Sequence, residues 1–417
     1  MNGSEGNVFR KTDQDVITYN FVKYKTRLLA FFLVYNGFTT FFRYISFILF
    51  GRATYATYSF LGLSLILLFF LFYRFPREKI GIQMLKALFV VAGIYIFNYF
   101  IFSNTRQYYN EYSDNLIEVV ILGIPTMVLI SEFDNPILLL KELRPMLRIL
   151  SALLPIIYLL GADTVYSPME WGNRCYRIAL LYFLCFKVDK ESNKPFEGLL
   201  LVIIIAFSTL GGRQSLVFMI VGMVLITIIK PQKTPKDVFI IFTMIIIAVF
   251  VILFYQSILE LLKYIISEFN INSRSLSKLA DESLFDTSNR ESIYLYSRQI
   301  ISVNRFSING LFADRLFLRQ YRHGIAYAHN FVYELLIDYG LLVGSTIIAF
   351  LIIGIIRAFF RCKKENKAFF ITIFIISFAK LIVSSSIVIE PGTLVCIGLM
   401  VNKRIKNPIK RKFLCFI

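Results

Sequence analysis

The chain has 417 residues, of which 57% are hydrophobic, 16% are aromatic and only 17% are charged. This composition excludes a soluble globular protein, a disordered chain and a collagen-like fibre, and it favours a protein that folds in lipid. The net charge is +18, from 45 Lys and Arg against 27 Asp and Glu. The five cysteines are scattered without CxxC spacing, so they predict neither a disulfide framework nor a metal site.

Apolar runs long enough to cross a bilayer recur along the whole chain. A spanning helix needs about 20 mostly apolar residues. The sequence therefore predicts an all-α, polytopic membrane helix bundle with about twelve transmembrane helices, in a single integral membrane domain over residues 1–417. Residues 1–27 are polar and no cleavable signal sequence follows them, so we expect the first span to be retained. The predicted spans are 28–50, 55–73, 82–103, 115–131, 147–162, 174–188, 196–211, 213–229, 238–256, 330–356, 368–387 and a weaker 389–402.

A pair of glycines divides the apolar stretch over 199–229 into two helices. A single helix over these residues would be about 46 Å long, which exceeds the thickness of a bilayer. Gly211 and Gly212 supply a turn in the middle, and Lys194 and Lys230 at the two ends both favour the cytoplasm. The stretch is therefore predicted to be a hairpin.

The Lys and Arg residues favour one orientation, because cytoplasmic loops carry an excess of them. With the N-terminus inside, 29 of the 45 lie on the cytoplasmic side and only five lie in the short outer connections. Arg43 and Lys380 are the clear charges within spans. We therefore expect both termini inside and one large extracytoplasmic loop over 257–329, between the ninth and tenth helices. A loop of this length is more often functional than idle.

Two residues at the outer ends of predicted helices are candidates for chemistry. Arg213 follows the glycine pair at a helix N-terminus, where its guanidinium and the free backbone N–H groups would bind an anion, or would only anchor the helix at the headgroups. His329 precedes the next inward helix, whose N-terminus disfavours imidazolium. A neutral ring there could act as a general base. The alternative is a hydrogen-bonded interfacial histidine.

The loop also carries arginines with helical spacing. A helix over 290–306 would place three arginines on one face and an apolar stripe on another: Arg290, Arg298 and Arg305, against Ile293, Tyr296, Ile300 and Val303. Three more arginines recur at i, i+4 and i+7: Arg315, Arg319 and Arg322. Such faces could bind phosphate or lie on anionic headgroups. Glu334 and Asp338, in the first turns of the following helix, are reserve candidates.

No motif indicates a nucleotide, metal or nucleic-acid site. Glycine-rich nucleotide motifs, HExxH and paired metal carboxylates are not found as convincing matches in the sequence. We expect no cofactor and no metal. Most of the net charge lies on short loops between helices, so it does not indicate nucleic-acid binding.

Three motifs, in this order, resemble the O-antigen ligase and polymerase superfamily, which includes the Wzy-type polymerases and lipid A-core ligases of bacterial surface polysaccharide. The motifs are Gly211-Gly212-Arg213-Gln214-Ser215, Ser288-Asn289-Arg290, and Ala328-His329-Asn330-Phe331 followed by a glycine-containing turn at Tyr339-Gly340-Leu341-Leu342-Val343-Gly344. The resemblance covers about residues 196–356. The family usually shows a glycine-rich run before the histidine, whereas residues 305–314 contain only Gly310. The choice between Arg290 and Arg298 for the second motif therefore stays open.

The resemblance implies a metal-independent membrane glycosyltransferase in the bacterial cytoplasmic membrane, with its active site on the extracytoplasmic side. It would polymerise undecaprenyl-pyrophosphate-linked repeat units into O-antigen, capsular polysaccharide or exopolysaccharide. The resemblance gives pyrophosphate binding to Arg213 and Arg290 and the general base to His329, with Arg298, Arg319 and Glu334 as additional candidates. Besides the lipid bilayer, the implied partners are a chain-length regulator and a flippase of the same pathway.

Two other functions stay open. An O-antigen ligase, which transfers finished glycan to another acceptor, shares the fold and the residues. A lipid-linked oligosaccharide flippase can also have twelve helices, but transporters usually carry charges within their spans and show internal repeats. Here few charges lie within the predicted spans and no repeat is visible. A scaffolding membrane protein is the remaining class.

Overall fold

The computed structural model describes residues 13–52, 54–74, 79–161, 165–188, 194–209, 213–229, 290–321, 327–383 and 385–402, with a few single positions between 238 and 268. The regular structure in these residues is helical throughout, which confirms the prediction of an all-α fold for this part of the chain. The predicted span 238–256 lies outside the described residues, apart from isolated positions.

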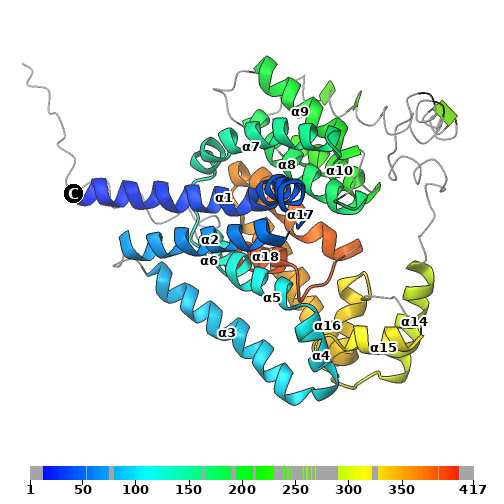
Figure 1. Ribbon diagram of the computed structural model, residues 1–417. Helices are drawn as coiled ribbons and strands as arrows, with labels where there is room; N and C mark the ends of the chain where they lie inside the picture. Colours follow the sequence, from blue (N-terminus) through cyan, green and yellow to red (C-terminus); the bar gives the residue numbers. More distant parts are fainter. Residues whose placement is uncertain are drawn as a thin grey trace, which may run out of the picture.

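Eleven of the predicted spans correspond to helices or helical stretches (Figure 1). The stretch over 113–131 is composite, because a π-helical segment, η2 (Val119–Gly123), joins α5 to α6. The helices are α1 (Asp13–Phe50), α2 (Thr54–Arg74), α3 (Ile80–Ile101), α4 (Arg106–Glu111), α5 (Ser113–Glu118), α6 (Ile124–Ser131), α7 (Pro136–Leu159), α8 (Pro168–Val188), α9 (Lys194–Thr209), α10 (Arg213–Ile229), α14 (Arg290–Val303), α15 (Ala313–Tyr321), α16 (Phe331–Arg361), α17 (Lys367–Val383) and α18 (Pro391–Val401).

Helix α1 begins 15 residues before the apolar run that predicted it. Its polar first half stays helical because its cations find partners on neighbouring elements. Lys25 Nζ donates to the backbone oxygen of Glu132 at 3.1 Å, and Arg27 Nε pairs with Glu142 at 2.7 Å. Helix α7 likewise begins 11 residues earlier than predicted. Hydropathy alone therefore underestimates helices that extend beyond the lipid.

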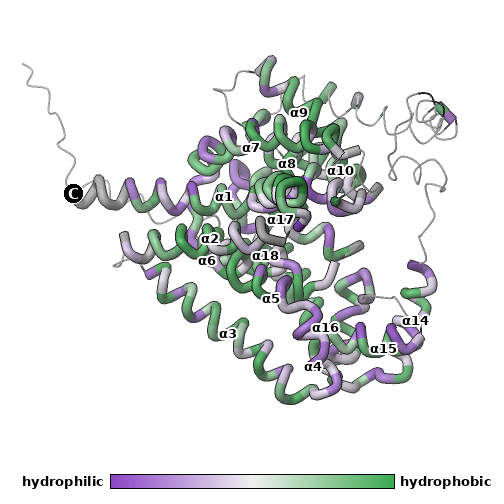
Figure 2. Tube along the Cα trace, viewed as in Figure 1, coloured by the Kyte–Doolittle hydropathy of each residue, from purple (hydrophilic) through white to green (hydrophobic). Residues whose placement is uncertain are grey.

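Four helical stretches in the described residues are long and apolar enough to cross a membrane: Asn20–Phe50, Ile80–Ile101, Ser113–Ser131 and Phe331–Arg361. Helix α3 exposes large apolar side chains along most of its length, including Phe89 at 74% exposure (Figure 2). An exposed apolar surface of this kind needs lipid or a partner to cover it. These features suggest a multi-pass membrane protein.

The centre of the bundle is formed by α7 and α8. A stripe of five leucines on α7, spaced three and four residues apart, is fully buried: Leu139, Leu143, Leu147, Leu150 and Leu154. Helix α8 is buried nearly all round from Cys175 to Cys185, as expected of a helix with neighbours on all sides. Helices α1, α9, α10 and α17 surround this pair (Figure 1).

Helix ends that are predicted to share a side of the membrane lie together. At the predicted cytoplasmic end, the Asn402 amide donates to the backbone oxygen of Phe133 at 2.8 Å. At the opposite end, Tyr95 Oη donates to the Val388 oxygen and the Asn98 side chain accepts from the Leu311 N–H. The alternation of helix directions inferred from hydropathy is therefore compatible with the packing.

Residues 290–321 form a small cap beside the start of α16, which we call the α14–α15 cap (Figure 1). The apolar stripe predicted on α14 is partly correct, because Ile293 and Ile300 are buried while Val303, the last residue of the helix, is 78% exposed. The predicted helix extended to 306, so Arg305 lies beyond its end. The cap covers the break in α16 at Gly340, whose φ is +69°.

Candidate functional site

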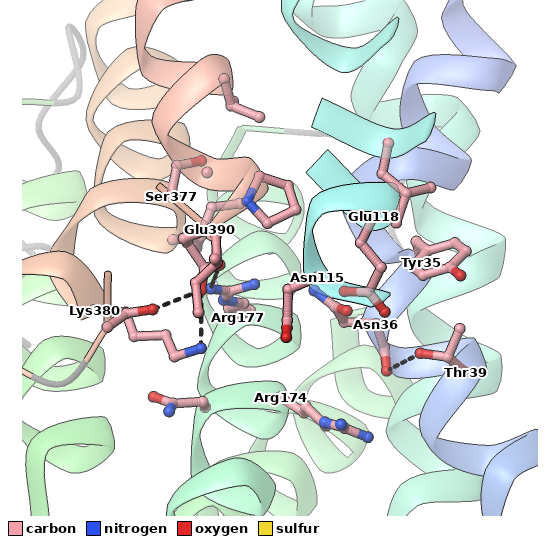
Figure 3. A pocket seen from close by; sticks show the side chains of 18 of the residues that line it. Tyr35, Asn36, Thr39, Asn115, Glu118, Arg174, Arg177, Ser377, Lys380 and Glu390 are labelled. Atoms are coloured by element: carbon pink, nitrogen blue, oxygen red, sulfur yellow. Dashed lines mark hydrogen bonds and ion pairs between the residues drawn. The ribbon is translucent and has the colours of Figure 1, made fainter. Parts of the chain in front are cut away.

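A polar cavity of about 360 Å³ lies within the bundle. Its walls come from α1, α5, α8, α17 and the segment leading into α18 (Figure 3). A cavity lined by charged side chains inside an otherwise apolar helix bundle is a candidate functional site. The ionisable residues that line it, apart from Tyr35 and Tyr327, are Arg43, Glu118, Glu170, Arg174, Arg177, Lys380 and Glu390.

One half of the cavity is neutralised by its own charges. Glu390 Oε1 accepts from Arg177 Nη2 at 3.0 Å, and Glu390 Oε2 accepts from Lys380 Nζ at 2.9 Å and from Ser385 Oγ at 3.0 Å. The three charged side chains converge in Figure 3, where a dashed line joins Glu390 to the Lys380 nitrogen. This carboxylate therefore ties α8 to α17 at the point where α18 begins.

The other half carries two arginines without such compensation. Arg174 Nη1 donates to Thr40 Oγ1 at 2.6 Å, and its guanidinium lies 4.5 Å from the centre of the Tyr166 ring. Arg43 lies 5.7 Å from the centre of the same ring, and its Nε is buried without a hydrogen-bond partner. No described carboxylate forms an ion pair with either arginine.

The start of α8 explains how the cavity is held next to α10. Ser167 and Glu170 form a capping box, in which each residue's backbone N–H donates to the other's side chain, so the Glu170 carboxylate is committed to the helix end. Asn173 lines the cavity and its Oδ1 accepts from Ser215 Oγ on α10 at 3.5 Å. Helix α10 begins at Arg213, as predicted, and the position of the Arg213 side chain lies outside the described part of the structure.

His329 lies in the turn immediately before α16. It has a positive φ of +54°, which is unusual for a residue other than glycine. Its Nδ1 is buried and has no hydrogen-bond partner among the residues that the structure describes. Burial, and then the positive charge of Arg290, lower the pKa of His329 from 6.5 to about 4. The ring is therefore neutral at physiological pH, with burial rather than the helix N-terminus as the main cause.

Tyr327 connects His329 to the cavity. Its ring lies 4.1 Å from the His329 ring between centroids, and its side chain also lines the cavity. The charge of Arg290, at the start of α14, lowers the pKa of His329 and opposes the burial that raises the pKa of Tyr327 to about 12. The charge of Arg290 therefore acts on His329, and His329 contacts Tyr327, which lines the cavity.

The remaining candidates are engaged elsewhere. Arg298 is exposed on α14, and its Nε donates to its own helix at the Tyr294 oxygen. Arg319 forms a two-point ion pair with Glu111 on α4, with one contact at 2.9 Å. Glu334 is buried and accepts from the Ile387 N–H at 2.8 Å and from Ser386. These contacts give Arg319 and Glu334 structural roles that are sufficient to explain them.

The suggested placement of Arg315 on a surface face is wrong. Its side chain is fully buried, where it pairs with Asp314 and Glu334 and donates to Ser386 Oγ at 2.8 Å. Burial alone would lower its pKa, but the nearby carboxylates outweigh burial and raise it above the ordinary value. Arg315 turns inward because the carboxylates of α15 and α16 meet there, whereas Arg319, four residues on, stays partly exposed and Arg322 lies outside the described residues.

The same cluster is the only metal-like arrangement in the described residues. Carboxylate oxygens of Asp314, Glu334 and Asp338 lie within 4.8 Å of one another. Most of these oxygens already accept hydrogen bonds, and the Arg315 guanidinium supplies the countercharge. The donor set therefore fits an internal ion-pair network better than a metal site. Asp338 Oδ2 has no hydrogen-bond partner.

None of the residues predicted from the sequence as a site lines the cavity. Arg43 and Lys380 stood out only as charges within spans, a signal that could have identified them as functional candidates. Nothing in the sequence indicated that Arg174, Arg177 and Glu390 would join them. Comparison with protein-family models finds no match for the chain, and comparison with curated proteins finds none either.

Proposed function

We propose that this protein is a glycosyltransferase of the bacterial cytoplasmic membrane that extends undecaprenyl-pyrophosphate-linked glycans on the extracytoplasmic side, as a Wzy-type polymerase does. The observation that carries the proposal is His329, a neutral histidine that feels the charge of Arg290 and contacts Tyr327, which lines a polar cavity in an apolar bundle. The motif resemblance supports the same assignment. The proposal includes about twelve spanning helices with both termini in the cytoplasm.

The proposed reaction needs a base and a site for the leaving group. The hydroxyl oxygen of the acceptor sugar attacks the anomeric carbon of the donor glycan, and the bond from that carbon to the pyrophosphate oxygen breaks. His329 takes the hydroxyl proton, and undecaprenyl pyrophosphate leaves with the electron pair. Arg290 and Arg213 would stabilise the developing charge by charge-assisted hydrogen bonds without a metal. Because both substrates are anchored in one membrane, their orientation lowers the entropic part of the barrier.

The low pKa of His329 is consistent with this role once substrate is bound. A base with a pKa of about 4 is weak, since efficient general bases have pKa values near the working pH. Part of that depression comes from the charge of Arg290. A pyrophosphate bound to Arg290 would neutralise this charge and raise the pKa of His329. Donor binding would thus strengthen the base just before it is needed.

A specific observation favours a lipid-linked oligosaccharide flippase as a second candidate. The cavity holds Arg43, Arg177, Lys380, Glu118 and Glu390 inside the bundle, and charged residues within spans are typical of transporters. The sequence alone indicated fewer such charges. A ligase would use the same residues as a polymerase, so the chemistry of the site does not distinguish these two enzymes.

A deletion strain scored for surface glycan length separates the three functions. Loss of a polymerase should leave single repeat units on their usual acceptor. Loss of a ligase should leave long chains on carrier lipid, and loss of a flippase should trap lipid-linked repeats inside the cell. Complementation with His329→Ala should fail to restore long chains, whereas His323→Ala, which changes the only other histidine, should restore them. Normal chain lengths with His329→Ala at normal expression would refute the mechanism.

A further inference from the structure

We propose that Arg43 and Arg174, which both line the cavity and lie against the Tyr166 ring, form an oxyanion-binding site separate from Arg290 and His329, and that it binds the carboxylate of an acidic sugar. The site follows from the cavity itself, whether or not the protein is a transferase. The two arginines come from α1 and α8, and Tyr166, in the segment before α8, supports them from behind.

The charges of the two halves of the cavity differ. Glu390 neutralises much of the charge of Arg177 and Lys380, with contacts of 3.0 Å and 2.9 Å. Arg43 and Arg174 contribute two positive charges with no ion pair among the described residues, although both are half-buried. Cations withdrawn from water without an ion-pair partner are unfavourable. An oxyanion that enters this half could pair directly with both guanidinium groups, which Glu118 on the same cavity does not do.

The donor groups are already held in position. The Tyr166 hydroxyl donates to the Thr40 oxygen at 2.8 Å, and Arg174 Nη1 donates to the Thr40 hydroxyl at 2.6 Å. Both guanidinium groups lie against the Tyr166 ring, which restricts their motion. Arg43 lines the cavity, and the structure shows no hydrogen bond from it to the described residues. A planar guanidinium matches a carboxylate in a two-point contact.

The rest of the cavity favours an oxyanion that also carries hydroxyl groups. Glu118 faces the cavity and feels the charges of Arg174 and Arg43 without pairing with them. Its carboxylate repels a second negative charge but accepts hydrogen bonds from hydroxyls. Asn36, Asn115 and Thr39 line the same region (Figure 3). An acidic sugar has one carboxylate and several hydroxyls, whereas a pyrophosphate has several negative charges and none.

The test measures thermal unfolding of the purified full-length protein in detergent, with added sodium glucuronate, glucose or inorganic pyrophosphate at matched ionic strength. A ligand that binds only the folded state raises the unfolding midpoint. Glucuronate should raise the midpoint and glucose should not. Arg43→Gln and Arg174→Gln should each weaken glucuronate binding about tenfold or more, as expected for loss of a hydrogen bond between charged groups. Arg106→Gln removes an exposed arginine away from the cavity and is the matched control.

Glu118→Gln provides a readout that does not depend on loss of binding. It removes the negative charge opposite the arginines, so it should tighten the binding of pyrophosphate. If pyrophosphate stabilises the wild type more than glucuronate does, and both arginine variants lose this effect, the oxyanion site stands and the carrier lipid, not the sugar, supplies the anion. The proposal is overturned if neither oxyanion stabilises the wild type, or if Arg43→Gln and Arg174→Gln respond as the wild type does. The assay requires no catalysis, so its outcome is independent of the glycan-length experiment.

Discussion

Replacement of Arg315 by Met should open the α14–α15 cap. The Met side chain keeps much of the apolar volume but removes the cation that, among the described residues, pairs with the buried carboxylates Asp314 and Glu334. Breaking a buried ion pair in this way destabilises a protein by about 3 to 5 kcal/mol, because the remaining charges stay buried without a partner. Lost stacking of the guanidinium on Phe312, 4.7 Å from the ring centre, adds to the effect.

Arg319→Met is the matched control for this experiment, because it lies one turn further along the same helix. Arg319 pairs with Glu111, but the two side chains are 34% and 42% exposed. Exposed ion pairs contribute only about 0 to 1 kcal/mol. The two variants therefore differ in expected effect although they remove the same chemical group from neighbouring turns.

Limited proteolysis of the cap measures the difference. When opening is fast relative to cleavage, the cleavage rate follows the population of the open form. Arg315→Met should therefore be cleaved roughly two to three orders of magnitude faster than the wild type, and Arg319→Met by about fivefold or less. Equal cleavage rates for the two variants would show that the buried network does not hold the cap.

Three further changes have defined outcomes. The pKa of His329 in the folded state, about 4, lies below its unfolded value of 6.5. The free energy of unfolding should therefore rise with pH between about 4 and 6.5 and then level off, and His329→Gln should reduce this slope in thermal unfolding. Gly340→Ala should destabilise by about 2 kcal/mol or more, because φ is +69° and a Cβ would lie 2.9 Å from the Ser307 oxygen, whereas Gly93→Ala, in open space on α3, should not. Asp338→Asn should change the unfolding midpoint little, and adding EDTA to the wild type should not change it. A large drop in the midpoint in both experiments would indicate a bound metal in the carboxylate cluster.

The sequence predicted the helices well because a bilayer imposes a simple length rule. Apolar runs gave the positions of α2, α3, α9, α10 and α16 to within a few residues, apart from the C-terminal end of α16. Hydropathy missed the polar extensions of α1 and α7, because the stability of these extensions comes from tertiary partners. The Lys25 contact with the Glu132 oxygen joins residues 107 apart, and no local pattern predicts it.

The candidate site was predictable only in part, for a similar reason. The motifs suggested both His329 and Arg290, and in the structure the charge of Arg290 acts on His329. Arg319 and Arg298 have the spacing of a binding face, but spacing does not reveal whether a carboxylate such as Glu111 already pairs with the arginine. The cavity arginines come from helices far apart in the chain, and only the packing of α1 against α8 brings Arg43 next to Tyr166.

The break in α16 implies an order of assembly. The Asp338 oxygen accepts from the Asn309 and Gly310 N–H groups, and the Leu341 N–H donates to the Arg305 oxygen at 2.7 Å. Backbone N–H and C=O groups that lack hydrogen bonds are costly in hydrocarbon. A newly inserted α16 would therefore be more stable as a continuous helix, in which these groups bond to one another. It would bend only when residues 305–310 dock onto it. Residues 305–310 are synthesised before α16 and can dock only after α16 has inserted. His329 lies between these two segments in the chain, so its surroundings are completed late in folding.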